Sequence, residues 1–122
     1  MIKPVFDTNI LIDALCNVDD AKEEIERYSH IYISVITWME VLAGAKNKRQ
    51  EKIIRDFLAT FELIELDENV REAAINIRKK QKIKLPDAII LASAQSQNTI
   101  LVTRNIKDFS AKDPSIRIPY KL

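Results

Sequence analysis

The chain has 122 residues, of which 47% are hydrophobic and 30% charged, so it fits a single domain over residues 1–122 with its own core. It contains only one glycine, one histidine and one cysteine, which excludes a P-loop, a dinucleotide fingerprint, a histidine or cysteine metal cluster and a disulfide. The net charge is +1, no apolar run is long enough for a membrane span, and the first residues lack the order of a signal peptide, so we expect a cytoplasmic protein.

Short apolar segments alternate along the chain with segments of helical spacing. Strands are predicted at residues 3–7, 30–36, 62–66, 99–103 and 116–119. Helices are predicted at about 8–16, 19–28, 37–46, 50–61, 67–81 and 86–97. Asp67 is expected to cap the fifth helix, and Pro86 to occupy the first position of the sixth, where its missing N–H costs nothing.

This alternation predicts an α/β fold of three layers, α/β/α, around a central parallel sheet of four to five short strands. In open sheets of this kind, ligands bind beyond the carboxyl ends of the strands. Asp7 and Thr103 each stand at the end of a predicted strand, so the functional site is expected there.

Asp7 ends the strand of "PVFDTNILID" and precedes a helix. It can be the cap of that helix, a position where aspartate is favoured, or a metal ligand at the end of the strand. Thr8 and Asn9 fit either role, because they can cap the helix or hold a carboxylate in place.

Glu40 lies in "WMEVLAG", where nearly all neighbours are apolar, and it shares a helix face with Thr37 and Gly44. It is either an exposed residue of an amphipathic helix or a buried acid that must be paired or bound to a metal. The apolar neighbours favour a helix that is buried on all sides, with Gly44 leaving room for a ligand.

Two more acids lie near later predicted boundaries. Asp87 follows Pro86 at a helix start, where an acid complements the helix dipole or points into a cleft. Asp108 follows the strand at 99–103 and fits a turn residue or a ligand. Asp13, near the end of the first helix, is not expected to belong to the site. Carboxylates are the hard oxygen ligands that suit Mg²⁺ or Mn²⁺.

Four segments in this order resemble the PIN-domain nucleases, and more closely the VapC-type toxins of toxin–antitoxin pairs. They are "VFDTNILID", "ISVITWMEVLAG", "LPDAIILASA" and "ILVTRNIKDF", and the resemblance covers essentially the whole chain. It implies a PIN-like fold with one or two Mg²⁺ or Mn²⁺ ions held by a set of acids. These acids are Asp7, Glu40, Asp87 and, as the fourth, Asp108.

The resemblance also implies that Thr103 and Asn105 line the site, beside Thr8 and Asn9. Many PIN domains carry an acid where this chain has Asn105. An asparagine can still coordinate through its amide oxygen, but without charge, so a second metal ion would be held less tightly.

The function implied by the resemblance is that of a metal-dependent endoribonuclease that acts as a toxin. Such proteins are typically homodimers silenced by an antitoxin, so DNA is contacted only through that antitoxin. The substrate is expected to be single-stranded or loop RNA of tRNA, rRNA or mRNA, because the strand must be extended to reach an acidic pocket.

The basic residues are gathered in a few segments, with five in residues 46–55 and five in residues 78–84. They form either a track for nucleic acid or simply solvated helix faces. The residues assigned to RNA phosphates are Lys46, Lys48, Arg49, Arg104 and Lys107, with the run 78–84 as an alternative to the first three.

Two alternatives stay open. The first is a PIN nuclease of RNA processing. The second is a non-catalytic RNA-binding or scaffolding PIN domain; Asn105 favours this second alternative, and the intact acids oppose it. A phosphatase of the haloacid-dehalogenase kind is set aside, because it requires Asp-x-Asp after the first strand, where this chain has Asp7-Thr8-Asn9.

Overall fold

The computed structural model describes all residues, 1–122, and contains five strands and six helices. In chain order they are β1 (Val5–Phe6), α1 (Thr8–Leu15), α2 (Asp19–Glu26), β2 (Tyr32–Ser34), α3 (Val35–Ala43), α4 (Lys48–Leu58), β3 (Glu62–Ile64), α5 (Glu68–Lys80), α6 (Leu85–Ser96), β4 (Leu101–Val102) and β5 (Ile116–Arg117). None of the helices has the length and apolar character needed to span a membrane.

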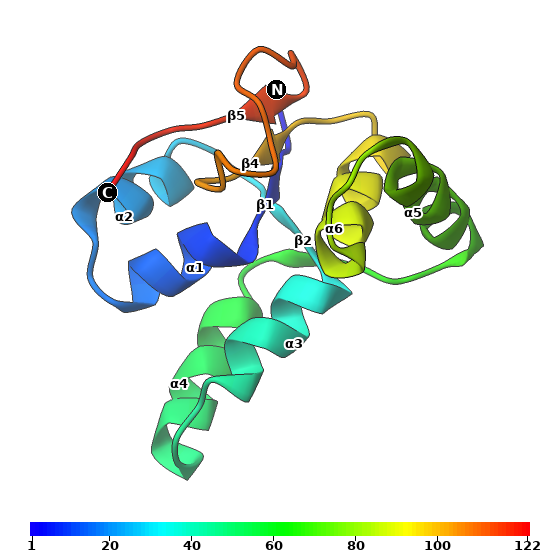
Figure 1. Cartoon of the computed structure of the whole chain (residues 1–122). Helices are drawn as coiled ribbons and strands as arrows, with labels where there is room; N and C mark the ends of the chain where they lie inside the picture. The colour runs from blue at the N-terminus through cyan, green and yellow to red at the C-terminus, as the bar shows by residue number, and fades with distance from the viewer.

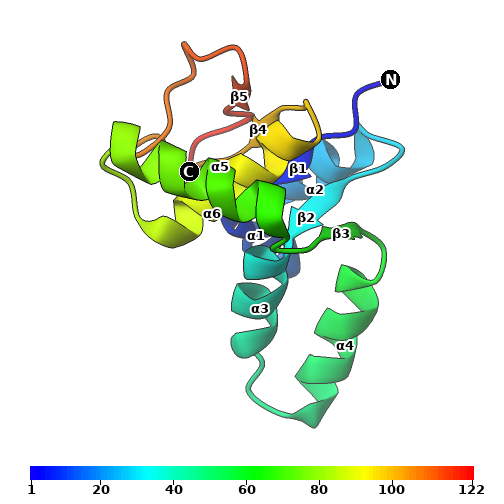
Figure 2. The same ribbon diagram turned by 90° about the vertical axis from the view of Figure 1, so that its right-hand side faces the viewer.

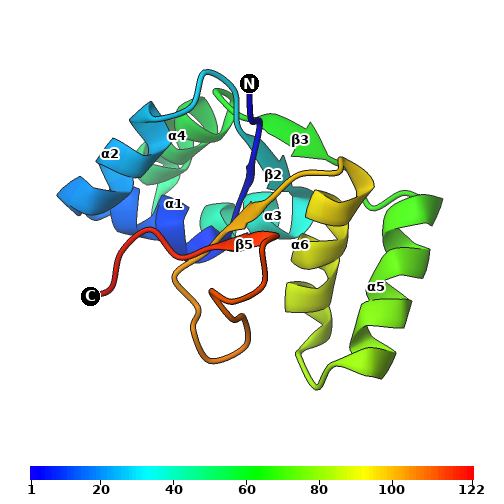
Figure 3. The ribbon, with the colours of Figure 1, turned by 90° about the horizontal axis from the view of Figure 1, so that it is seen from above.

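The strands form one parallel sheet in the order β3-β2-β1-β4-β5. Helices α5 and α6 cover one face, and α1 and α2 lie on the other (Figures 1 and 3). Helices α3 and α4 form a hairpin that extends away from the sheet (Figure 2). The predicted three-layer α/β/α fold with four to five parallel strands is confirmed.

The sheet separates two apolar clusters, because successive residues of a strand face opposite sides. Val5 of β1 belongs to the cluster formed with α5 and α6, whereas the next residue, Phe6, packs with α1. Leu101 and Val102 of β4 divide in the same way. All four side chains are fully buried, so these two-residue strands are held in place by the helices on both faces.

The order of strands reverses at β1, which has β2 on one side and β4 on the other. Such a switch point opens a crevice at the carboxyl ends of the strands. Phe6 pairs with Val102, so Asp7 and Thr103, the next residues, are neighbours at this edge. Helix α6 ends shortly before β4 begins, so its first turn, with Asp87, lies at the same edge.

The predicted start of α3 at Thr37 was wrong by two residues. The helix begins at Val35, because the side chain of Ser34 accepts a hydrogen bond from the backbone N–H of Ile36 at 3.1 Å. Val35 and Ile36 are therefore helical despite their β-branched side chains, and β2 is shorter than expected. This cap outweighs the local preference for a strand.

The starts of two other helices also differ from prediction. Helix α4 begins at Lys48, since the side chain of Asn47 caps it by accepting from the N–H of Gln50 at 2.8 Å. Helix α6 begins at Leu85, which places Pro86 second; the first four N–H groups of a helix have no intrahelical partner, so proline is tolerated there too.

The predicted cap at Asp67 is confirmed, with its side chain accepting from the N–H of Val70 at 2.9 Å.

Candidate active site

The site begins with Asp7, which is buried (4% exposed) between β1 and α1. Its Oδ1 accepts a hydrogen bond from the N–H of Thr8 at 2.7 Å, so Asp7 does cap α1. Its Oδ2 accepts from the Thr103 hydroxyl at 2.7 Å and from the Asn9 amide at 3.3 Å. Both oxygens therefore face neutral donors only.

The charge of Asp7 is not compensated by these donors. Burial raises the pKa of Asp7, and the nearby charge of Glu40 raises it further, against the lowering effect of the hydrogen bonds from Thr103, Thr8 and Asn9. The carboxylate thus lacks the opposite charge that a buried acid needs.

Asn9 and Thr103 are themselves held by the β4–β5 loop. The N–H of Arg104 donates to Asn9 Oδ1 at 3.1 Å, which turns the Asn9 NH₂ group toward Asp7. Thr103 Oγ1 accepts from the N–H of Asn105 at 3.0 Å while donating to Asp7. The two side-chain donors to Asp7 are therefore fixed by backbone groups of a single loop.

Glu40 is connected to the start of α1 through Thr8. Thr8 Oγ1 lies 2.7 Å from Glu40 Oε1 and 3.0 Å from Thr37 Oγ1. A carboxylate can only accept, so the Thr8 hydroxyl donates to Glu40 and accepts from Thr37, which is fully buried. This chain of hydroxyls holds a residue of α3 next to Asp7.

The expectation that α3 is buried on all sides was wrong. Glu40 and Met39 are exposed, because apolar residues such as Val41 and Leu42, which pack in the core, lie on the other side of α3. Gly44 is exposed as well, and a Cβ placed on it would meet only Val41 O, at an ordinary 3.4 Å. Gly44 does not make room for a ligand.

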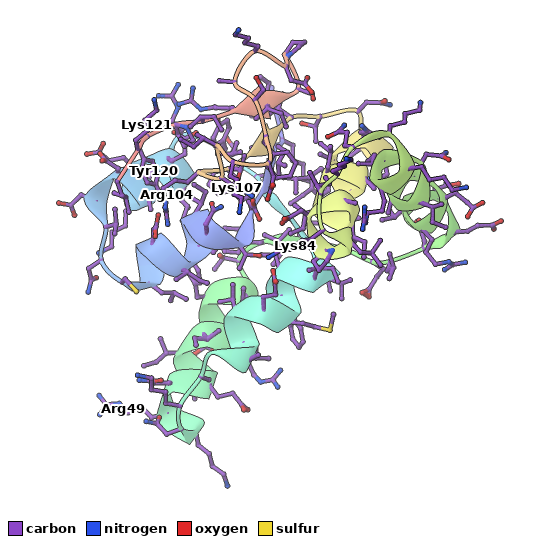
Figure 4. The ribbon with its side chains drawn as sticks, viewed as in Figure 1. Arg49, Lys84, Arg104, Lys107, Tyr120 and Lys121 are labelled. Atoms are coloured by element: carbon purple, nitrogen blue, oxygen red, sulfur yellow. The ribbon has the colours of Figure 1, made fainter.

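Asp87, in the first turn of α6, is half-buried and close to the other three acids. Burial raises its pKa to about 6, together with repulsion from Asp7, Asp108 and Glu40, while the nearby Lys84 ammonium acts in the opposite direction. Figure 4 shows Lys84 beside the start of α6. The structure thus brings Asp7, Glu40 and Asp108 within reach of the charge of Asp87.

Asp108 is positioned by Asn105 in the loop after β4. The Asn105 NH₂ group donates to Asp108 Oδ2 at 3.0 Å, and the N–H of Asp108 donates to Asn105 Oδ1 at 3.2 Å. The Asn105 amide oxygen, which was expected to be able to coordinate a metal ion, therefore accepts a hydrogen bond within the loop. Asn105 orients Asp108.

The basic residues assigned to RNA are not all near the acids. Lys46, Lys48 and Arg49 lie around the start of α4, and Figure 4 shows Arg49 at the far tip of the α3–α4 hairpin. Lys107 is exposed on the loop that carries Asp108.

The side chain of Arg104 is used within the protein. Its Nε and Nη2 donate to Asp13 at 2.7 and 3.1 Å, and Tyr120 Oη donates to Asp13 Oδ2 at 2.7 Å. Asp13 is 7% exposed, so it is a buried structural acid, which was not foreseen from its place as a polar residue near a helix end. The signal was in the sequence, because Asp13 falls on the same helix face as Ile10 and Ala14, which are buried.

The donor chemistry of the four acids fits a hard divalent cation. No three His, Cys, Asp or Glu side chains are grouped as ligands of one ion as they stand in the structure. Glu40 Oε2, Asp108 Oδ1 and both oxygens of Asp87 nevertheless accept no hydrogen bond from the protein, and Asp7 lacks charge compensation. Free carboxylate oxygens in a partly open site suit Mg²⁺ or Mn²⁺, which keep several waters.

A parallel sheet with acids gathered at its switch point agrees with the comparison to known families. The PIN domain profile matches residues 5–113, so the chain belongs to the PIN-domain family. The resemblance stated from the four sequence segments is confirmed.

Individual relatives are more specific. Ribonuclease VapC1 of Methanocaldococcus jannaschii is 30% identical over 112 residues, which cover 88% of this chain and 79% of that protein. A chain of a toxin–antitoxin complex from Klebsiella pneumoniae is 44% identical, with a TM-score of 0.92 over 98% of this chain and 100% of its own. A chain of VapBC2 from Rickettsia felis, bound to a promoter DNA fragment, is 27% identical, with a TM-score of 0.78 over 100% and 99%.

Proposed function

We propose that this protein is a metal-dependent endoribonuclease of the VapC type and the toxin of a toxin–antitoxin pair. The observation that carries the proposal is the meeting of Asp7, Glu40, Asp87 and Asp108 at the switch point of the sheet, with no basic side chain paired to any of them. The relatives support it, because one is a ribonuclease and others come from toxin–antitoxin complexes.

The four acids would hold one or two Mg²⁺ or Mn²⁺ ions. A bound ion would supply a water of lowered pKa and a Lewis acid for the phosphate oxygens. Neighbouring side chains keep three of the acids in place, and the pairs are Asp7 with Thr103 and Asn9, Glu40 with Thr8, and Asp108 with Asn105. Such partners fix the position of ligand oxygens before the substrate arrives.

The substrate we propose is single-stranded or loop RNA. The protein would act on it in the cytoplasm. The acids lie at the open edge of the sheet, where an extended strand can approach and a duplex is hindered by its fixed shape. We further propose that one nuclease domain occupies residues 1–122, since the family match leaves only short ends outside it.

The partner we propose is an antitoxin that places an Arg or Lys among the acids. A cation there would compensate the same uncompensated charge that a metal ion does, and would exclude it. DNA would be contacted through the antitoxin.

We also propose that the protein forms a homodimer. The support is a set of exposed apolar side chains, among them Leu66, Ile75 and Leu85, around a shallow apolar groove between α5 and α6. Light scattering after gel filtration tests the oligomeric state.

The test is cleavage of a mixed RNA pool by protein freed of any co-purified antitoxin. Internal cuts are expected with Mg²⁺ or Mn²⁺, and they should vanish with excess EDTA and in Asp7→Asn. Asp56→Asn is the matched control, because Asp56 is an exposed acid on α4. No cleavage across many RNAs, or equal cleavage by Asp7→Asn, would overturn the proposal and favour a non-catalytic RNA-binding domain.

A further inference from the structure

A hollow on the surface lies next to the acids and shares Asp108 with them, but most of its lining residues have no role in the site described so far. This groove, of about 630 Å³, is formed by the loop of residues 106–112 and the C-terminal segment of residues 118–121. Its size is within the range of small-molecule sites, roughly 300–1,000 Å³, so it can take a nucleotide.

The rim of the groove is basic. Lys107, Lys112 and Lys121 line it and are exposed. None of the three is in an ion pair, whereas other basic residues such as Arg104 and Arg117 are paired with acids. The three ammonium groups are therefore available to anionic groups of a ligand.

The floor of the groove is apolar and partly aromatic. Phe109 is buried, and Ile118 and Tyr120 are half-buried. An apolar floor beneath a cationic rim is complementary to a nucleotide, which has a flat apolar base and an anionic phosphate.

The C-terminal wall of the groove is anchored at two points. Tyr120 Oη donates to Asp13 at 2.7 Å, and Arg117 of β5 donates to both oxygens of Glu24, at 2.6 and 2.9 Å. Because these contacts are made with buried acids of α1 and α2, the wall is a fixed part of the fold.

The groove is continuous with the acids through Asp108, which lines it and also raises the pKa of Asp87. Figure 4 shows Lys107, Tyr120 and Lys121 in the same part of the molecule, whereas Arg49 lies at the opposite end. A strand with one phosphate at the acids would therefore place its neighbouring nucleotides in this groove.

We propose that the groove is a subsite for single-stranded RNA on one side of the cleaved phosphate. Lys107, Lys112 and Lys121 contact the phosphates, and a base packs on the half-buried Ile118 and Tyr120. The proposal rests on the proposed function for the position of the cleaved phosphate. An acidic peptide is the other ligand with suitable charge, but it has no flat ring for the aromatic floor.

Binding is measured first, because it does not depend on cleavage. A labelled single-stranded RNA of mixed sequence is titrated in EDTA with wild type and with Lys112→Ala/Lys121→Ala, which changes two exposed positions outside any ion pair. We expect Kd to rise roughly ten-fold at about 0.1 M salt. The slope of log Kd against the logarithm of the salt concentration should fall by about 0.7 for each lost phosphate contact.

Lys48→Ala/Arg49→Ala is the matched control, because it removes the same charge at the tip of the α3–α4 hairpin. Equal losses in the two variants would mean that only net charge matters, and would overturn the proposal. So would displacement of the RNA by an oligo-glutamate peptide as effective as unlabelled RNA, which would make the groove a peptide site.

Cleavage separates this proposal from the proposed function. If wild type cleaves RNA, Lys112→Ala/Lys121→Ala should raise KM for a long RNA with kcat nearly unchanged, and an unchanged KM would overturn the subsite. If wild type does not cleave, the proposed function fails, and the binding comparison alone decides whether the groove takes RNA.

Discussion

Two groups of acids in this protein each contain buried carboxylates, and these are compensated in opposite ways. Asp13 and Glu24, 7% and 4% exposed, each accept two hydrogen bonds from an arginine, Arg104 and Arg117. Asp7 is equally buried, at 4%, but its donors are neutral.

The difference indicates what each group is for. A buried charge needs compensation, and where the chain supplies it, as for Asp13 and Glu24, the acid ties a helix to the C-terminal part of the chain. At Asp7 the nearest charges are other acids, so the compensation has to come from outside the chain. A metal ion or an antitoxin cation fits this requirement.

The largest expected effect comes from exchanging one acid of each group for its amide. Asp7→Asn should reduce metal-dependent RNA cleavage by more than about 100-fold, while the free energy of unfolding without metal changes by less than about 1 kcal/mol. Asp13→Asn should instead lower the free energy of unfolding by about 2–3 kcal/mol, because Arg104 loses its charged partner. Urea denaturation and cleavage rates measure the two effects.

Glu51→Gln is the control for this pair of variants. Glu51 forms an exposed ion pair with Arg55 on α4, so its loss should cost less than about 0.5 kcal/mol. If Asp7→Asn lowers the free energy of unfolding as much as Asp13→Asn does, the charge of Asp7 is compensated within the chain like that of Asp13, and the difference between the two groups of acids is not real.

A smaller effect is expected from Thr103→Val, which keeps the shape of the side chain and removes its hydroxyl. Asp7 Oδ2 then loses its shortest donor, and the carboxylate is no longer held in position. We expect cleavage to fall about 10–100-fold, as for other residues that orient a metal ligand. Thr99→Val is the control, because Thr99 donates to a backbone oxygen of Lys3, away from the acids; an equal loss there would contradict the positioning role.

The compensated group can be tested by pH. Burial alone would raise the pKa of Glu24, but the hydrogen bonds and charge of Arg117, with the Tyr28 hydroxyl, lower it below its ordinary value of 4.5. Ionised Glu24 therefore stabilises the fold above that value, and the contribution is lost as the pH falls through the lowered pKa. Wild type should be more stable than Glu24→Gln at pH 7, with the gap closing below about pH 4. A gap that stays constant down to acid pH would show that the pair does not act through charge.

The position of two site residues could be predicted from pattern, because the ends of strands in an α/β fold can be read from the sequence. Asp7 and Thr103 were expected at strand ends, and the register of β1 with β4 places them together. For Asp87 and Asp108 the pattern left a helix-start acid and a turn residue as alternatives, and their assignment with Asp7 and Glu40 as metal ligands comes from the resemblance to PIN domains and stays a prediction.

The features that were missed depend on contacts between distant parts of the chain. The exposure of Glu40 could not be read from its apolar neighbours, because the sequence does not show which side of α3 meets α1. The partners of Asp13, Arg104 and Tyr120, lie 91 and 107 residues away. Only folding brings them together, although an acid on an apolar helix face was a signal that such a partner exists.

The smallest expected effect is the stabilisation of the uncompensated group by a cation. At about ten times its Kd, Mg²⁺ should raise the free energy of unfolding of wild type by about 1.4 kcal/mol, because it binds the folded acids and relieves their repulsion. The shift in thermal melting should disappear in Asp7→Asn and persist in Lys112→Ala/Lys121→Ala, which leaves the acids untouched. Sodium chloride at equal ionic strength controls for screening. A wild-type melting temperature that does not respond to Mg²⁺ or Mn²⁺ would mean that the acids tolerate their own repulsion, and the comparison between the two groups would then lose its physical basis.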